Sequence, residues 1–362
     1  MHRPPLRLSR RLPQRLIAAA AAAGLLVTLA ACGGDDTGAT AAPTEDTASD
    51  AGPLVVYSGR NENLVAPLLE QFTEATGIEV TARYGGSAEL AAQLLEEGER
   101  TPADVFLSQD AGALGALQNA DLLEPLDDAV LDRVPAQYRS AEGSWVGVSG
   151  RARVLVYNRD LVAEADLPQS VFDLTEPEYR GRVAFAPTNA SFQSFVTGMR
   201  VTAGEERTRE WLEGFAANDP QAYERNGLIV DAVNDGQVPM GLVNHYYLYE
   251  KAAETEGGLE ALNARNHFFP GGDIGSLVNV AGVGVLPGNA DDRTAAFVDF
   301  LLSEEGQTYF AEETKEFPLI DGVEADVPGL PSLESVDAPD VDLSDLDTLD
   351  ETLRLLDEVG LT

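Results

Sequence analysis

Hydrophobic positions follow two alternating periods along the chain from residue 54 onward. The apolar run at 54–57 ends in Ser58-Gly59, which predicts a buried strand followed by a turn. Apolar residues then recur at helical spacing over 64–72 and predict a helix that ends at Gly77. The pattern continues with strands at 78–82 and 103–107 and a helix at 90–95. This order of elements is typical of a parallel α/β sheet.

The middle of the chain repeats the pattern and predicts a second α/β lobe. Its elements are strands at 153–157, 183–185 and 238–243 and helices at 191–203 and 207–217. A long apolar strand at 278–285, a helix at 290–302 and a helical end after residue 345 complete the chain. If strand 278–285 and a strand near 148–157 both cross between the lobes, they form a two-crossing hinge, a geometry that permits closure.

This hinge divides the folded body into three segments. Residues 53–148 are expected to form the first part of lobe one, 149–279 lobe two, and 280–362 the second part of lobe one with the C-terminal helices. Lobe one is therefore predicted to contain both ends of the folded body.

The N-terminal segment has the pattern of a bacterial lipoprotein signal. Five arginines precede an almost wholly apolar run at 16–29, which ends in Leu29-Ala30-Ala31-Cys32. The run is shorter than the ~20 apolar residues of a membrane-spanning helix. We therefore expect residues 1–31 to be a signal peptide and Cys32, the only cysteine of the chain, to be lipidated. An ordinary cleavable signal with an unused cysteine is the alternative.

The segment that follows Cys32 predicts a flexible tether. Residues 33–52 are rich in Gly, Ala, Thr, Ser and Asp and contain no large apolar side chain, so they cannot bury enough surface to order themselves. The folded body is thus expected to be exported. Residues 32–52, with the lipid on Cys32, are expected to hold it at the outer face of the cytoplasmic membrane.

Composition excludes several classes of function. The chain has 24 basic and 61 acidic residues and a formal charge of −37; without its five N-terminal arginines the charge is −42. Binding to nucleic acid or to anionic lipid requires basic patches, so a nucleic-acid role is not expected. The body also has no cysteine nucleophile and no Gly-x-Ser-x-Gly, His-Glu-x-x-His or Gly-x-x-x-x-Gly-Lys motif, and no enzymatic activity is predicted.

Short motifs spread over the whole body resemble one family. They are Val56-Tyr57-Ser58-Gly59, Thr76-Gly77-Ile78, Pro102-Ala103-Asp104-Val105-Phe106, Ser149-Gly150-Arg151-Ala152-Arg153-Val154, Ala186-Pro187-Thr188, Asn244-His245-Tyr246-Tyr247 and Ser303-Glu304-Glu305-Gly306-Gln307. With them the body resembles the ferric-ion-binding subunits of bacterial ABC iron importers, the transferrin-like solute-binding proteins. The resemblance implies a bilobal, periplasmic-binding-protein-like fold.

The tyrosine pair is the motif particular to iron. Ferric ion is a hard cation that prefers oxygen donors, and a bound metal eases the loss of a phenolic proton. Tyr246 and Tyr247 could both be ligands if the chain turns from strand to helix after Val243, because neighbours on a regular element point apart. Alternatively, Tyr246, Tyr247 and Tyr249 are core and surface aromatics of a helix.

Members of this family commonly hold phosphate or carbonate beside the metal. By position, the resemblance implies anion contacts at Asn189, Ala190, Ser191, Asn226 and Asn244. Free backbone N–H groups at a helix N-terminus bind anions without a formal charge, which suits Asn189 and Ser191. A plain helix cap is the other interpretation, and the two are compatible.

Lobe one departs from the family pattern. The resemblance implies a histidine and a glutamate where this chain has Asn61 and Gln109. Glu62 is a candidate replacement carboxylate, and Arg60 could hold a second, metal-coordinating anion. Glu62 could equally be an exposed residue in the first turn of a helix.

The resulting hypothesis is a lipid-anchored, monomeric receptor. It would capture ferric ion with a small anion between the lobes and deliver it to an ABC permease and its ATPase. A receptor of the same fold for another solute, such as a phosphonate or a different metal, is the alternative, and an exported hydrolase a weaker one.

Overall fold

The computed structural model describes residues 52–362. The predicted signal peptide, Cys32 and nearly all of the tether lie outside these residues. Among the helices of residues 52–362, none is both long and apolar enough to cross a membrane.

The strands form a continuous mixed sheet in the order β2-β1-β3-β9-β4-β7-β5-β6, with β8 paired to β4. The strands are β1 Leu54–Ser58, β2 Val80–Tyr84, β3 Val105–Ser108, β4 Val146–Asn158, β5 Val183–Phe185, β6 Gln221–Ala222, β7 Met240–Asn244, β8 Ala264–His267 and β9 Val278–Val285. Strands β1, β2 and β3 pair in parallel, as predicted, whereas β9 pairs antiparallel with both β3 and β4.

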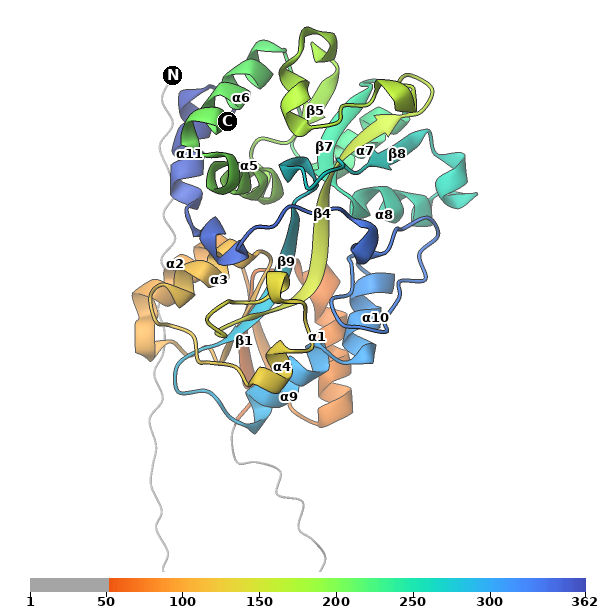
Figure 1. The fold of residues 1–362 in the computed structure, drawn as a ribbon. Coiled ribbons are helices and arrows are strands. Elements are labelled where there is room, and N and C mark those ends of the chain that lie inside the picture. The colour runs from red at the N-terminus through yellow and green to blue at the C-terminus, as the bar shows by residue number, and fades with distance from the viewer. Residues whose placement is uncertain (1–51) are drawn as a thin grey trace, which may run out of the picture. The chain divides into compact units, whose positions relative to one another are not determined.

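Strand β4 connects two lobes. Its residues 146–152 pair with β9, and its residues 153–158 pair with β7 and β8. All thirteen residues of β4 are buried. Figure 1 shows β4 running from the lower lobe, which contains β1 and β9, into the upper lobe, which contains β5 and β7. The chain returns to lobe one at the start of β9, so the fold is the bilobal α/β architecture expected from the sequence.

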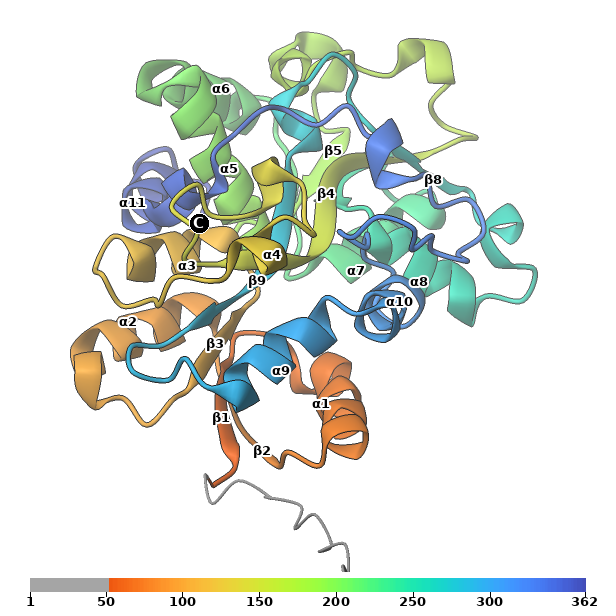
Figure 2. The same ribbon diagram turned by 60° about the horizontal axis from the view of Figure 1, so that its bottom comes forward.

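Helices cover both faces of each part of the sheet. They are α1 Glu62–Thr76, α2 Ser87–Glu97, α3 Ala111–Gln118, α4 Asp128–Leu131, α5 Ala190–Ala203, α6 Glu205–Ala217, α7 Asn226–Asn234, α8 Tyr246–Glu254, α9 Asp292–Leu301, α10 Glu304–Glu312 and α11 Leu349–Glu358. In lobe one, α1 and α9 lie on one side of the strands and α2 and α3 on the other (Figure 2). In lobe two, α5 and α6 lie opposite α7 and α8 (Figure 1).

Aromatic side chains form the centre of each lobe. In lobe one, Phe72 of α1 packs edge to face on Phe297 of α9, with ring centroids 5.1 Å apart. In lobe two, Trp211 of α6 stacks on Phe215 at 5.0 Å, and its indole N–H donates to the Val171 carbonyl (2.8 Å). These contacts bury large apolar surfaces at the centre of each lobe, and the one polar atom among them, the Trp211 indole nitrogen, has a hydrogen-bond partner.

The C-terminal end differs from its predicted place in lobe one. The 3₁₀ turn Leu343–Asp347 packs on α3 of lobe one, where a Cβ at Gly112 would lie 2.3 Å from the Leu346 carbonyl oxygen. Helix α11 instead packs on α5 of lobe two, and the hydroxyls of Thr197 and Thr352 lie 2.8 Å apart. The apolar face of α11 is covered by lobe two, so residues 343–358 form a further connection between the lobes.

Candidate functional site

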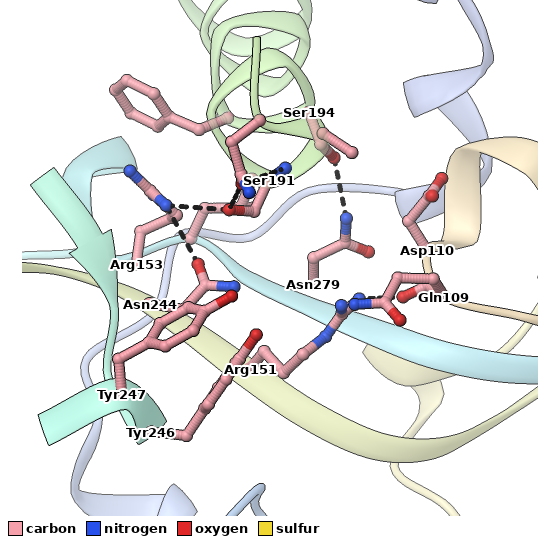
Figure 3. Close-up of a pocket in the computed structure, with 14 residues that line it drawn as sticks. Gln109, Asp110, Arg151, Arg153, Ser191, Ser194, Asn244, Tyr246, Tyr247 and Asn279 are labelled. Carbon is pink, nitrogen blue, oxygen red and sulfur yellow. Dashed lines mark hydrogen bonds between the residues drawn. The ribbon is translucent and has the colours of Figure 1, made fainter. Parts of the chain in front are cut away.

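A small cavity of about 70 Å³ lies where β4 passes from one lobe to the other. Its walls come from the ends of β3 and β7, from β4 and β9, and from the N-terminal ends of α3, α5 and α8. The lining residues are Gln109, Asp110, Arg151, Arg153, Asn189, Ala190, Ser191, Ser194, Phe195, Asn244, Tyr246, Tyr247, Leu277 and Asn279. Figure 3 shows that polar groups from both lobes face one another here.

The two candidate tyrosines lie side by side. Strand β7 ends at Asn244 and α8 begins at Tyr246, so the expected turn from strand to helix is present. The rings of Tyr246 and Tyr247 lie 4.3 Å apart between centroids, and Figure 3 shows both hydroxyls on the same side of the cavity. Tyr249 lies elsewhere and donates its hydroxyl to the Gly329 carbonyl (2.9 Å).

Burial raises the pKa of Tyr246 well above its ordinary value, and the neighbouring Tyr247 raises that pKa further. The Tyr246 phenol is therefore protonated at neutral pH. A highly charged cation is needed to displace its proton and convert the phenol into a ligand.

Four of the five predicted anion contacts form one hydrogen-bonded cluster. Asn189 caps α5, with its side-chain oxygen accepting from the Ser191 N–H (3.0 Å) and hydroxyl (2.5 Å). Asn226 donates to the Ser191 hydroxyl (3.2 Å). The Nη1 atom of Arg153 donates hydrogen bonds to the Ser191 hydroxyl (3.1 Å) and to the Asn244 side-chain oxygen (3.0 Å). The fifth contact, Ala190, also lines the cavity, so the helix cap and the candidate anion site coincide.

Arg153 gives this cluster a positive charge. It is only 3% exposed, and within the described residues its Nε and Nη2 atoms have no hydrogen-bond partner. Burial lowers the pKa of Arg153 to about 10, with an opposing influence from Tyr247 and Tyr246, so the guanidinium remains charged at neutral pH. A buried cation with unused donors is costly unless an anion joins it.

Lobe one contributes polar groups that the sequence did not identify as site residues. Asp110 caps α3 by accepting from the Ala113 N–H (3.2 Å), and burial raises its pKa while Arg151 partly offsets that increase. Asn279 donates to the Ser194 hydroxyl of α5 (2.7 Å) and accepts from the Ala111 N–H of α3 (3.2 Å). Asn279 therefore links the two walls of the cavity.

The structure does not bring Arg60 and Glu62 to the cavity. Asn61 caps α1 by accepting from the Asn63 N–H (3.0 Å), and Glu62 is exposed in the first turn of that helix. The guanidinium of Arg60 is buried against the carboxylate of Glu316, with nitrogen to oxygen distances of 3.1 and 2.9 Å. The proposals of Arg60 as an anion contact and of Glu62 as a ligand therefore find no geometric support.

His245 precedes the tyrosines, but both of its ring nitrogens are occupied. The Ala152 N–H donates to Nδ1 (3.1 Å), and Nε2 lies 3.1 Å from the Lys315 carbonyl oxygen. Among the described residues, no group of three or more His, Cys, Asp and Glu side chains could hold a metal. The donors available to a cation here are the two phenols, the Asp110 carboxylate and the neighbouring amide and hydroxyl oxygens.

Comparison with known proteins identifies the family of the chain. Residues 100–345 match the family model described as bacterial extracellular solute-binding protein. The chain is 38% identical to the Fe(3+)-binding periplasmic protein of Serratia marcescens over 85% of its length and 90% of that relative.

Two solved structures have the same fold. Iron-bound HitA from Pseudomonas aeruginosa is 36% identical, with a TM-score of 0.77 over 86% of this chain and 100% of that one. A Trichodesmium protein in complex with iron and citrate ligands is 29% identical, with a TM-score of 0.72 over 86% of this chain and 100% of that one. The chain belongs to the family of bacterial extracellular solute-binding proteins, and its resemblance to the ferric-ion-binding members is confirmed.

Proposed function

We propose that this chain captures ferric ion together with a small synergistic anion in the cavity between its lobes. The observation that carries the proposal is the pair of phenols of Tyr246 and Tyr247, whose hydroxyls lie together opposite a cluster of hydrogen-bond donors. Phenolate oxygens suit a hard trivalent cation. Two phenolates supply two of the ligands that such a cation needs, and exogenous oxygen atoms supply others.

The anion would lie at the N-terminal end of α5. Backbone N–H groups at that helix end, the side chains of Ser191 and Asn244, and the free donors of Arg153 favour an oxyanion. Carbonate and phosphate are small enough for a cavity of about 70 Å³. Citrate is a third anion to test, because the Trichodesmium relative is described in complex with iron and citrate.

The receptor would act by binding and delivery rather than by catalysis. Cargo that contacts both lobes favours the closed state, and the closed state would be recognised by an ABC permease with its ATPase. We propose that the protein is exported and monomeric and that lipid on Cys32 holds it at the outer face of the cytoplasmic membrane.

The test is a ferric titration of residues 33–362 followed by visible absorption. It is run with carbonate, phosphate, citrate or no added anion, on the wild type and on Tyr246→Phe and Tyr247→Phe. Tyr249→Phe is the matched control, because its hydroxyl lies outside the cavity and bonds to Gly329.

A tyrosinate-to-iron charge-transfer band that saturates at one equivalent is expected in the wild type and in Tyr249→Phe. The band should weaken in either cavity variant and strengthen with the anion. If the wild type shows no such band under any of the anion conditions, the proposed function is refuted.

A further inference from the structure

A buried charge network lies behind the cavity. Arg60 forms a two-point ion pair with Glu316, and the two side chains are 1% and 3% exposed. Oε2 of Glu316 also accepts hydrogen bonds from the hydroxyls of Ser149 (2.6 Å) and Thr314 (3.2 Å). The Glu316 carboxylate is therefore fixed by groups from three separate segments of the chain.

Arg151 connects this network to the cavity. Its Nε atom lies 3.9 Å from Oε1 of Glu316, and its Nη2 atom donates to the Gln109 carbonyl oxygen. The side chain is 4% exposed, and both Arg151 and Gln109 line the cavity. Figure 3 shows the Arg151 guanidinium extending past Tyr246 toward Gln109. The Glu316 carboxylate therefore lies near the Nε atom of Arg151, and the Nη2 atom of the same guanidinium lies at the cavity wall.

The distribution of charge indicates what this arrangement does. Arg60 already pairs with Glu316 at both oxygens, whereas Arg151 reaches that carboxylate only at 3.9 Å and without a hydrogen bond. Glu316 can therefore orient the Arg151 guanidinium without cancelling all of its charge. The remaining positive charge lies in the wall of the same cavity as the N-terminal end of α5, where the anion would bind.

Burial alone would raise the pKa of Glu316, but Arg60, Arg151 and the hydrogen bonds from Arg60 and Ser149 hold it below its ordinary value. The carboxylate is thus ionised at neutral pH and available to attract Arg151.

We propose that Glu316 is a positioning residue of the anion-assisted ferric site, which holds Arg151 toward the bound anion while Arg60 holds Glu316 in place. This inference rests on the proposed function. It assigns a role in anion use to a residue that touches neither the ion nor the anion. A network that only stabilises the hinge region would leave the anion dependence of ferric binding unchanged.

The test uses the double variant Arg60→Met/Glu316→Gln, which replaces both members of the ion pair at once. Replacing both members of a buried pair is tolerated far better than removing one. The control is Arg209→Met/Glu358→Gln, which removes an exposed ion pair and leaves the same net charge. Ferric affinity is measured by competition with a chelator, at increasing carbonate and phosphate, with the charge-transfer band as a second readout.

The wild type and the control should gain ferric affinity equally as the anion is added. In Arg60→Met/Glu316→Gln we expect that gain to fall at least tenfold while the anion-free tyrosinate band persists. Arg151→Gln should show the same loss of anion dependence. The triple variant Arg60→Met/Arg151→Gln/Glu316→Gln should show no further loss, because the effects of residues that act through one another are not additive.

Wild-type anion dependence in the pair variant, or losses that multiply in the triple variant, would overturn the inference. If the pair variant does not fold, Glu316→Asp decides, because it keeps the charge and withdraws the carboxylate by one methylene. A several-fold weaker anion effect in Glu316→Asp is then expected, and an unchanged one contradicts the role. A wild type without a tyrosinate band refutes the proposed function separately.

Discussion

His245 makes the stability of the apo protein sensitive to acid. The ring is fully buried and stacks on Phe317, with centroids 4.2 Å apart. Its Nδ1 accepts the Ala152 N–H, so the hydrogen-bond pattern assigns the neutral tautomer with the proton on Nε2, which donates to the Lys315 carbonyl. Protonation of Nδ1 would place two N–H groups against each other and a charge in a dry site.

The size of the effect follows from the pKa of His245. Burial lowers that pKa to about 4, although Glu316 and the hydrogen bond to Lys315 partly oppose the change. In the unfolded chain the imidazole titrates near ~6.5. Between these values the unfolded state binds more protons, so the free energy of unfolding falls as the pH drops. The expected loss between pH 7 and pH 4.5 is roughly 2 to 2.5 kcal/mol.

The assay is urea denaturation of apo protein at pH 7, 5.5 and 4.5, for the wild type and for His245→Asn. The amide oxygen of Asn can accept from the Ala152 N–H but does not titrate. Burial raises the pKa of Glu250 to about 7, which gives a stability contribution of opposite sign, but both chains contain Glu250. The difference between the two chains therefore isolates His245.

As the pH falls from 7 to 4.5, the free energy of unfolding of the wild type should decrease by roughly 2 to 2.5 kcal/mol more than that of His245→Asn. Parallel curves for the two proteins would refute the assignment of a neutral, buried imidazole.

Three further predictions concern the lobes and the cavity. Gly112→Ala should lower the free energy of unfolding by about 1–3 kcal/mol, because its Cβ would lie 2.3 Å from the Leu346 carbonyl oxygen; urea denaturation measures this, and an unchanged midpoint contradicts it. Ferric binding should release one proton from each phenol, so calorimetry in two buffers should count one proton fewer for Tyr247→Phe than for the wild type. Arg153→Gln should weaken the anion's effect on ferric affinity at least tenfold, and an unchanged anion titration would exclude a role for its free donors.

Local patterns were sufficient to predict most of the individual elements. The apolar spacing and Gly77 predicted α1 correctly, and the alternation of elements predicted the parallel strands β1 to β3. The antiparallel insertion of β9 between β3 and β4 was not predictable, because strand partners are set by contacts between distant segments. The same reason explains why α11, amphipathic in sequence, gave no indication that lobe two would cover it.

Neighbouring residues were sufficient to predict which side chains gather at the cavity, and their roles as ligands stay predictions. The tyrosine pair and the cap of α5 are local motifs, and the structure brings both to one cavity. Arg60 and Glu62 were wrongly placed there because proximity in sequence does not reveal that Arg60 turns inward to Glu316, 256 positions away. The sequence did contain a signal that Arg151 and Arg153 line a charged site. Two charges at alternate positions of a mostly apolar strand share one face, and a buried face with two arginines requires a negative partner.

The charges around the cavity explain why cation and anion are expected to bind together. Two arginines line a cavity in a chain whose net charge is −37, so the cavity is a positive region within an acidic protein. Two phenolates cannot neutralise a trivalent ion, and Arg151 and Arg153 add positive charge beside it. Asp110, the one carboxylate in the lining, can supply a single negative charge. An oxyanion that contacts both the metal and the arginines removes this repulsion, whereas ferric ion without an anion leaves positive charge uncompensated in a buried site. The dependence of ferric binding on the anion is therefore a consequence of the lining itself.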